Sequence, residues 1–415
     1  MGHGLLPLRV SRGPRPSHAD TVSVSFRTQC RQDLLLVGGP VFLALRELWF
    51  ARSRFGMMGG VVALIAVLMV LLSGLSSGLV NDGVSGLKKL PVAAFAFADG
   101  TKLDGAFSRS VVGADQVDAW RGRPDVAAAE PFGNLLVNAH SGSGVPIDLA
   151  LFGVNPGSFL APPARVGAAL GPADGLVVSS TALDAGLRVG DTVTIDRLGT
   201  RLTVIGATAE QRTFGHVDVA YIPLPTWRLI HAGARADNEV RPEALNEATA
   251  VAIKARNGAS LDLAAGDAAA GTTSVTLAES FGASPGYTAE TSTLTLIQVF
   301  LYAISALVVG AFFTVWTIHR KHELAVLRAM GASRSYLLRD GLTQALIILV
   351  TASAVGVLAG LGVGALVGGG APFALEAPSV FLAGVLLIAL GLVGAASAII
   401  RIAAVDPLAA LGGQR

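Results

Sequence analysis

Four long apolar runs dominate the pattern of hydrophobic and polar positions along this chain. They cover residues 57–80, 294–318, 342–367 and 380–400, and none of them contains Asp, Glu, Lys, Arg or His. The run at 294–318 has 25 residues. At ~1.5 Å per residue, a helix of that length exceeds the ~30 Å hydrocarbon core of a bilayer. The pattern therefore predicts four transmembrane helices, and the Gly and Ala content of the last two suits close helix packing.

Residues 81–293 show a different pattern, in which short apolar runs are separated by Gly, Pro and Asp. Alternating β-branched residues predict strands, and three stretches have helical spacing. The predicted strands are 145–154, 175–180, 189–195, 201–206, 219–223 and 250–254, the predicted helices are 181–186, 225–231 and 261–270, and 233–246 is a predicted loop. Because strands and helices do not alternate regularly, the segment is predicted to be an α+β domain.

Composition and charge support this division and orient it. The chain is 52% hydrophobic and only 14% charged, against about 25% charged in soluble proteins. Residues 81–293 hold 22 acidic and 16 basic residues, net −6, whereas the rest holds 7 and 15, net +8. Basic loops stay in the cytoplasm, so both termini are predicted inside and the domain outside. The predicted fold class is membrane α-helical, with four transmembrane helices and a large α+β extracytoplasmic domain inserted between helices 1 and 2.

These boundaries divide the chain into ten segments. They are a disordered N-terminal extension (1–40), an amphipathic interfacial helix (41–56), the first transmembrane helix (57–80), the extracytoplasmic domain (81–293), the second transmembrane helix (294–318), a cytoplasmic coupling loop (319–341), the third transmembrane helix (342–367), a short outer turn (368–379), the fourth transmembrane helix (380–400) and a cytoplasmic tail (401–415). For 41–56, a plain juxtamembrane extension is the alternative.

The N-terminal extension also raises the question of the start site. It is rich in Gly, Pro, Ser and Arg, and no methionine lies between Met1 and Met57. The pattern typical of a membrane protein begins at Val41. Initiation at a valine codon is therefore a second hypothesis, which the mass of the native protein tests.

Motif searches exclude several function classes. The chain has no G-x-x-x-x-G-K-[ST], H-E-x-x-H or G-x-S-x-G motif, so a P-loop and the commonest metalloprotease and hydrolase sites are not predicted. Cys30 is the single cysteine, which rules out a disulfide within one chain and a thiolate metal cluster. The apolar runs lack the ionisable residues that proton-coupled transporters need. Energy for any transport is expected from a partner, and the chain is predicted not to be an enzyme.

The basic segment after the second apolar run resembles a stretch of the FtsX/MacB-like permeases of ABC transporters. That family has R-x-x-E-[LIF]-x-[LV]-[LMR]-[KR]-A-x-G, which residues 320–331 follow, and a terminal D-P-x-x-A-[LI], which 406–411 follow. Residues 176–195 are similar to its outer-domain pattern of strand, small helix and V-G-D-x-V. The resemblance covers about 41–413. It implies a permease in the bacterial cytoplasmic membrane, with both termini cytoplasmic and ATP bound by a separate ATPase subunit.

A narrower resemblance is to the HrtB/DevC branch of this superfamily. It rests on F-L-A-L-R-E at 42–47, S-G-L-S-S-G-L at 73–79 and P-G-Y-T-A-E at 285–290. In that branch HrtB-type permeases export haem and DevC-type permeases export lipids. The resemblance implies a lipophilic substrate, with haem as the first expectation, although the R-A-M-G at 328–331 follows the general family form.

The same resemblance assigns the loop after the second transmembrane helix to contact with the ATPase. The candidate ATPase-coupling residues are Arg320, Lys321, Glu323, Leu324, Leu327, Arg328, Met330 and Gly331. Within this set, the apolar members recur at helical spacing, and the glycine allows a turn before the next helix. The alternative is an interfacial loop that only satisfies the preference for basic residues inside.

The candidate substrate-binding residues are Tyr287 and Glu290, just outside the second transmembrane helix. They are about one helical turn apart and so share a face. Tyrosine is a known axial haem ligand. The alternative is a helix cap with an interfacial tyrosine. His140 and His216 are isolated candidates for a metal or haem ligand, and no resident metal site is predicted.

Together these observations predict the membrane permease subunit of an ABC exporter. It is expected to work as a homodimer with ATPase subunits, in contact with membrane lipid and not with nucleic acid, and to extrude a lipophilic substrate such as haem. The alternative is an FtsX-like signalling permease that transports nothing and transmits ATPase motion to a cell-wall hydrolase or sensor kinase. An adhesion or scaffold protein outside the ABC class is disfavoured by the 320–331 pattern. No intrinsic cofactor is expected.

Overall fold

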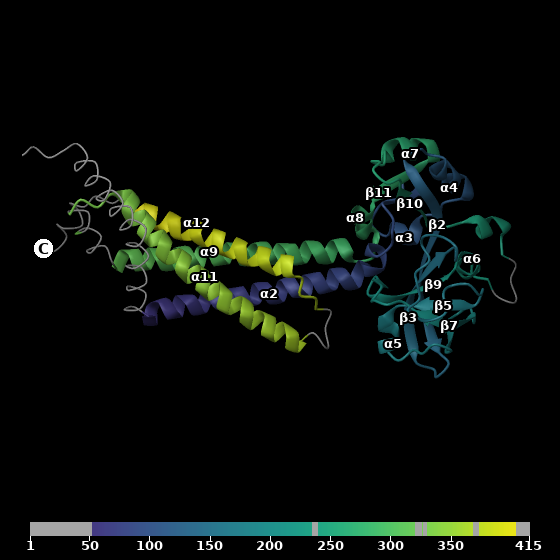
Figure 1. Cartoon of the computed structure of the whole chain (residues 1–415), viewed down its shortest axis with the longest axis horizontal. Coiled ribbons are helices and arrows are strands. Elements are labelled where there is room, and N and C mark those ends of the chain that lie inside the picture. The colour runs from purple at the N-terminus through teal and green to yellow at the C-terminus, as the bar shows by residue number, and fades with distance from the viewer. Residues whose placement is uncertain (1–51, 235–239, 320–325, 327–329, 368–372, 404–415) are drawn as a thin grey trace, which may run out of the picture. The chain divides into compact units, whose positions relative to one another are not determined.

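The computed structural model describes residues 52–234, 240–319, 326, 330–367 and 373–403. Within these ranges four helices are long and apolar enough to cross a membrane. They are α2 (Arg52–Lys88), α9 (Tyr287–His319), α11 (Arg334–Val367) and α12 (Ala377–Ala403) (Figure 1). The prediction of four transmembrane helices is confirmed. The predicted N-terminal extension (1–40) and residues 41–51 of the predicted interfacial helix (41–56) lie outside the described residues, and α2 already begins at Arg52.

The first two long helices extend further toward the outer domain than the hydropathy pattern predicts. Helix α2 ends at Lys88 rather than at residue 80, and α9 begins at Tyr287 rather than at 294. The residues that prolong α2 include Val84 and Leu87, both of which are fully buried. Their packing compensates for the polar and glycine residues that make 81–88 resemble the end of a helix.

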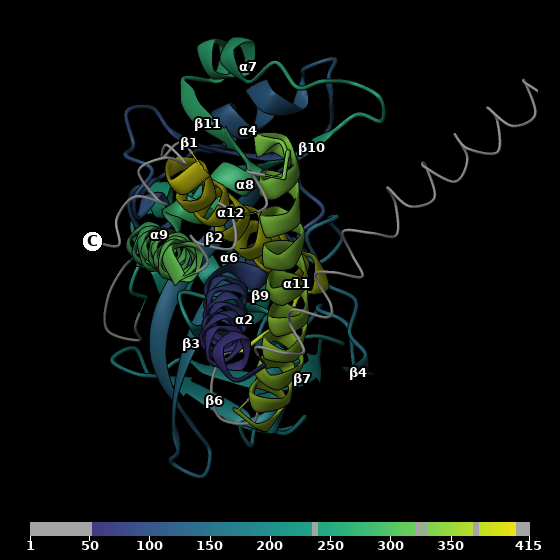
Figure 2. The ribbon, with the colours of Figure 1, turned by 90° about the vertical axis from the view of Figure 1, so that its left-hand side faces the viewer.

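The inner portions of the four helices, 52–68, 301–359 and 382–403, form one compact unit. Figure 2 shows α2 and α9 nearly end-on and α11 along its length. Small residues set their separation, because a Cβ on Gly356 of α11 would lie 2.3 Å from the carbonyl oxygen of Ala63 in α2. A Cβ on Gly394 of α12 would lie 2.4 Å from the carbonyl oxygen of Ala306 in α9. Glycine at these positions allows the helix backbones to approach closely.

The outer domain is built on a mixed sheet of eleven strands. Its main path has the order β11-β1-β10-β2-β3-β9-β5-β7-β4, while β6 pairs with β2 and β7, and β8 pairs with β9. The strands are β1 (Ala94–Ala98), β2 (Val126–Ser141), β3 (Pro146–Val154), β4 (Val166–Gly167), β5 (Gly175–Val178), β6 (Thr192–Ile195), β7 (Arg201–Ala207), β8 (Thr213–Phe214), β9 (Val217–Pro223), β10 (Ala250–Ala255) and β11 (Thr272–Thr276).

Short helices cover this sheet. They are α3 (Ala106–Arg109), α4 (Ala114–Arg121), α5 (Ser180–Asp184), α6 (Leu224–His231), α7 (Leu263–Ala270) and α8 (Leu277–Ser280), with 3-10 turns η1 (Pro242–Asn246) and η2 (Phe281–Ala283). The six predicted strands correspond to β3, β5, β6, β7, β9 and β10, and the three predicted helices to α5, α6 and α7. The α+β prediction is confirmed, although η1 occupies the end of the predicted loop.

The longest of the elements that the sequence pattern missed is strand β2. Its first half pairs with β10, and its second half pairs with β3 and β6. β2 therefore joins two halves of the domain, one containing β11, β1 and β10 and the other containing the remaining strands. The sequence V-A-A-A-E-P-F-G-N contains Pro131 and Gly133 and few β-branched residues, so strand propensity is weak. Cross-strand pairing compensates for that weakness.

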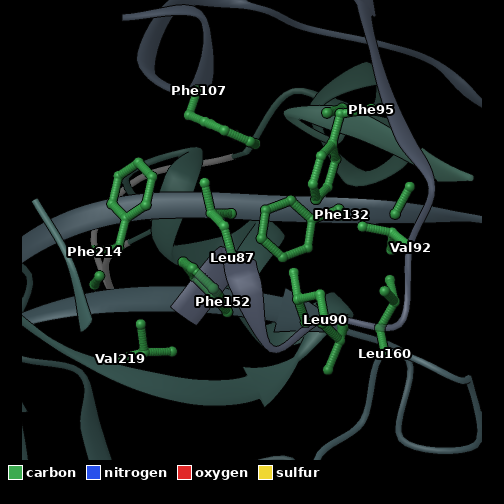
Figure 3. Packing of buried hydrophobic residues seen from close by; sticks show 14 of the residues in the cluster. Leu87, Leu90, Val92, Phe95, Phe107, Phe132, Phe152, Leu160, Phe214 and Val219 are labelled. Atoms are coloured by element: carbon green, nitrogen blue, oxygen red, sulfur yellow. The ribbon is translucent and has the colours of Figure 1, made fainter. Parts of the chain in front are cut away.

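An aromatic core lies where the two halves of the domain meet (Figure 3). Phe107 and Phe132 contact each other at 5.9 Å between ring centroids, and Phe132 contacts Phe152 at 4.9 Å. Leu87, near the end of α2, and Leu90 belong to the same cluster. The end of α2 is thus part of the core of the outer domain, and this packing positions the site described next.

Candidate functional site

The hairpin formed by β8 and β9 holds the end of α2 against the domain. Its two connecting residues, Gly215 and His216, have φ of 59° and 65°, as a type I′ hairpin turn requires. The Gly215 N–H donates to the carbonyl of Gly83 at 2.9 Å. This turn brings His216, far along the chain from either long helix, to the junction of α2 and α9.

His216 bridges the two helices. Its Nδ1 lies 2.9 Å from Asp82 Oδ2 on α2, and its Nε2 lies 3.1 Å from each carboxylate oxygen of Glu290 on α9. The three side chains are partly exposed, at 31% for the imidazole, 23% for Asp82 and 39% for Glu290. An imidazole ring with a carboxylate at each nitrogen can donate a hydrogen bond to both when it carries two protons. The structure therefore links a candidate ligand, Glu290, to a candidate histidine.

Tyr287, the other candidate substrate residue, is the first residue of α9 and is partly buried. Its ring meets Phe281 edge-on at 6.2 Å between centroids. Glu290 also belongs to the first helical turn, and its backbone N–H donates to the carbonyl of Gly286 at 3.0 Å. Tyr287 and Glu290 are therefore one turn apart at the start of α9.

A cavity of about 390 Å³ adjoins this junction inside the outer domain, and His216 lines it. Three acidic residues also line it, namely Asp148, Asp191 and Asp218. Burial raises the pKa of the Asp218 carboxyl, although hydrogen bonds from Thr181 and Ser179 act in the opposite direction. The wall also contains alanine, leucine and valine side chains. Three carboxyl groups line this cavity, so it does not suit an anionic group.

The second histidine candidate, His140, lies elsewhere in the domain. Its Nδ1 is 2.7 Å from Asp196 Oδ1, in an exposed pair near the pairing of β2 with β6. Among the described residues, it forms no hydrogen bond or ion pair with Glu290 or Tyr287. Across the part of the chain that the structure describes, no group of three or more His, Cys, Asp or Glu side chains could hold a metal ion.

Six of the eight candidate ATPase-coupling residues lie outside the described residues, namely Arg320, Lys321, Glu323, Leu324, Leu327 and Arg328. Met330 is 72% exposed, and Gly331 has φ of 99°. Glycine adopts this left-handed conformation without a Cβ clash, and the chain bends here before α11 begins.

Asp82 is the residue of the junction that the sequence analysis did not select. The expected end of the apolar run at residue 80 placed Asp82 in the outer domain, with no helix to carry it. A signal was available, because Val80, Val84 and Leu87 continue the helical spacing of apolar residues past that point. Its pairing with His216 has no sequence signal, since the two residues are 134 positions apart.

The four apolar helices and the inserted sheet-rich domain define a multi-pass membrane permease. Known families agree with that class. The "FtsX-like permease C-terminal" family matches residues 295–407, and the "MacB-like periplasmic core domain" family matches residues 55–270. The second match covers more than half of the chain. The chain belongs to this family and is an ABC-transporter permease of the FtsX/MacB type in a bacterial membrane.

Curated relatives extend the comparison. A protein of Staphylococcus epidermidis named "Putative hemin transport system permease protein HrtB" is 29% identical over 127 residues, which are 31% of this chain and 36% of the relative. The protein of the same name in Staphylococcus haemolyticus is 33% identical over 132 residues, again 31% and 36%. The chain thus aligns with about a third of the length of these relatives.

Solved structures were also compared. The extracellular domain of the noncanonic ABC-type transporter YknZ from Gram-positive bacteria is 14% identical to this chain. The match covers 40% of this chain and 84% of that domain, with a TM-score of 0.29. The periplasmic region of MacB from Actinobacillus actinomycetemcomitans has 12% identity, covers 45% and 91%, and gives 0.33.

Proposed function

We propose that this chain is the transport subunit of an ABC exporter that uses a separate ATPase and moves a lipophilic substrate, with haem as the first candidate. The observation that carries the haem proposal is the likeness to the two hemin transport permeases over about 130 residues. The permease is proposed to act as a homodimer with both termini in the cytoplasm. The loop containing Met330 and Gly331 is proposed to contact the ATPase.

The junction at the start of α9 supports a substrate site at Tyr287 and Glu290. A carboxylate and a phenol lie one turn apart at the end of an apolar helix, where an amphipathic molecule leaves the hydrocarbon. The neighbouring cavity contains three carboxylates, which would repel the propionates of haem. The proposed substrate position is therefore on the α9 side of His216 and not inside that cavity.

The test is a titration of the purified permease–ATPase complex with haemin, in which ATPase activity and the Soret band are recorded together. Haem export predicts stimulated ATP hydrolysis and a Soret shift. Both should weaken in Tyr287→Phe and in Glu290→Gln. Tyr302→Phe is the matched control, because Tyr302 is a partly buried tyrosine further along the same helix.

Two other results would redirect the proposal. Stimulation by a phospholipid but not by haemin would replace haem with a lipid substrate. Unchanged ATPase activity with every lipophilic compound, together with no Soret shift, would refute export and favour the signalling role. In that case deletion of the gene for this chain should alter cell-wall hydrolysis or sensor-kinase output instead of haem tolerance.

A further inference from the structure

We propose that the outer domain is fixed rigidly to α2 and hinged on α9, with Pro285–Gly286 as the hinge and the His216–Glu290 pair as a latch that holds the hinge closed. This device goes beyond the proposed transport function and does not depend on the substrate. It follows from an asymmetry in how the two helices join the same domain, within residues 69–300, which form one compact unit with 360–381.

The connection to α2 is buried and made by many groups. Ser85 Oγ accepts from the Thr213 N–H at 2.9 Å and lies 2.7 Å from Thr213 Oγ1. A Cβ on Gly86 would lie 2.8 Å from a methyl of Val219, so the helix backbone lies directly on β9. Leu87 is fully buried in the aromatic core. Relative movement of α2 and the domain would break all of these contacts together.

The connection to α9 is different in kind. Ser284, just before it, is fully buried, and its Oγ donates to the Gly83 carbonyl at 3.1 Å. Gly286 then has φ of 78°, a conformation in which glycine is not strained. The backbone bond that spans it, from the Tyr287 N–H to the Ser284 carbonyl, is 3.4 Å long, which is long for such a bond. The rigid part of the domain therefore ends at Ser284.

Beyond Gly286, the first turn of α9 meets the domain through the Tyr287–Phe281 ring contact and the His216–Glu290 pair, and the Thr288 hydroxyl lies beside Gly282. The ring contact has no hydrogen bond to define its geometry. The pair is partly exposed, so water can replace it when it opens. Hinges of this kind lie at a few residues between rigid elements. A moving α9 would thus open the latch, whereas a moving α2 would carry the whole domain.

The experiment measures spin-label distances in the full-length chain in detergent, without ATPase or substrate. Cys30 is replaced by serine, and labelled chains are diluted with unlabelled ones so that pairs within one chain dominate. One pair, Ser108→Cys with Ser292→Cys, spans the domain and α9. The other, Ser108→Cys with Ser77→Cys, spans the domain and α2. Ser108 and Ser292 are exposed, and Ser77 is partly exposed.

The latch is opened by Glu290→Ala. Its matched control is Glu210→Ala, which removes the ion pair that Glu210 makes with Lys89 at 2.6 Å beside the end of α2. Losing a partly exposed ion pair should raise the open population about two- to fivefold. The distribution of domain–α9 label distances should therefore broaden in Glu290→Ala, while the distribution of domain–α2 label distances stays narrow. Neither distance should change in Glu210→Ala.

A second variant keeps the test independent of Glu290. His216→Asn removes the imidazole but tolerates positive φ, so the hairpin turn is retained. It should broaden the domain–α9 distance as much as Glu290→Ala, and the double variant should add little. An unchanged domain–α9 distance in both single variants would overturn the latch. Equal broadening of both distances would overturn the rigid attachment to α2. Neither result would affect the haemin titration, so the two proposals fail separately.

Discussion

One buried hydroxyl contributes to the attachment of α2 to the outer domain. Ser85 is fully buried, and its Oγ accepts from the backbone N–H of Thr213 at 2.9 Å. The Thr213 hydroxyl is 2.7 Å from the same oxygen and also donates to the Asn81 carbonyl at 3.3 Å. Ser85→Ala removes the acceptor of a buried amide, the N–H of Thr213.

The expected effect follows from that unsatisfied amide. Leaving a buried backbone donor without an acceptor costs about 1–3 kcal/mol. The variant should therefore open the β8–β9 hairpin more often, by a factor of roughly 5 to 150. Thr213→Val should have a smaller effect, because it loses the hydroxyl but keeps the amide bond to Ser85.

Hydrogen–deuterium exchange of the full-length chain measures this opening. Peptides that cover β8 and β9 should exchange faster in Ser85→Ala by the same factor, while peptides from β10 should not change. Ser77→Ala is the matched control, because Ser77 lies about two turns earlier on the same helix and is partly exposed.

Two results would contradict this reasoning. If the hairpin exchanged at the wild-type rate in Ser85→Ala, the hydroxyl would not hold α2 to the domain, and the rigid attachment would lose its strongest contact. If all peptides of the domain exchanged faster together, the serine would stabilise the whole fold and not this junction.

Three further substitutions test other parts of the structure. Gly153→Ala should lower the melting temperature of the chain, because its Cβ would lie 2.4 Å from Trp227 and overpacking costs about 1–3 kcal/mol; an unchanged melting temperature would show that the indole can shift. Burial lowers the pKa of His231 in the folded chain below its ordinary value of about 6.5. The stability that the neutral imidazole contributes is therefore fully present above that ordinary pKa, and it is lost as the pH falls from there through the lower pKa of the folded chain. The melting temperature should fall as the pH is lowered in the wild type, and it should fall less in His231→Phe. Equal falls in the two proteins would contradict a lowered pKa of His231. Gly394→Leu should destabilise the detergent-solubilised chain, because its Cβ would lie 2.4 Å from a carbonyl oxygen of α9. Gly384→Leu should not, because nothing lies within 4 Å of a Cβ at that position. Equal effects of the two substitutions would refute the close approach of α12 to α9.

Much of the fold could be predicted from periodicity alone. The uncharged runs around 294–318 and 342–367 can lower their free energy only inside a membrane, because water cannot solvate so many adjacent apolar side chains. The alternation at 189–195 and the β-branched run at 219–223 determine strands in the same local way. The first half of strand β2 could not be predicted, because Pro131 and its alanines give no local preference and its pairing partner there, β10, is remote in sequence.

The candidate site was only partly visible in the sequence. Tyr287 and Glu290 were selected by their position before an apolar run, and the structure places them at the start of α9. Whether they bind substrate remains a prediction. His216 was an isolated histidine in the sequence, with nothing to indicate that a hairpin turn would bring it between Asp82 and Glu290.

The sequence by itself determined the four membrane helices, the inserted α+β domain and the permease family, because each depends on the order of residues within a short window. Only the tertiary structure decided where α2 ends, which strand joins the halves of the domain, and that His216 links α2 to α9. The physical reason is that these features depend on burial and on pairs of groups far apart in the sequence, such as His216 with Glu290 at 74 positions and with Asp82 at 134. Such pairs form when the packed core brings their backbones together, and no local preference of either partner specifies them.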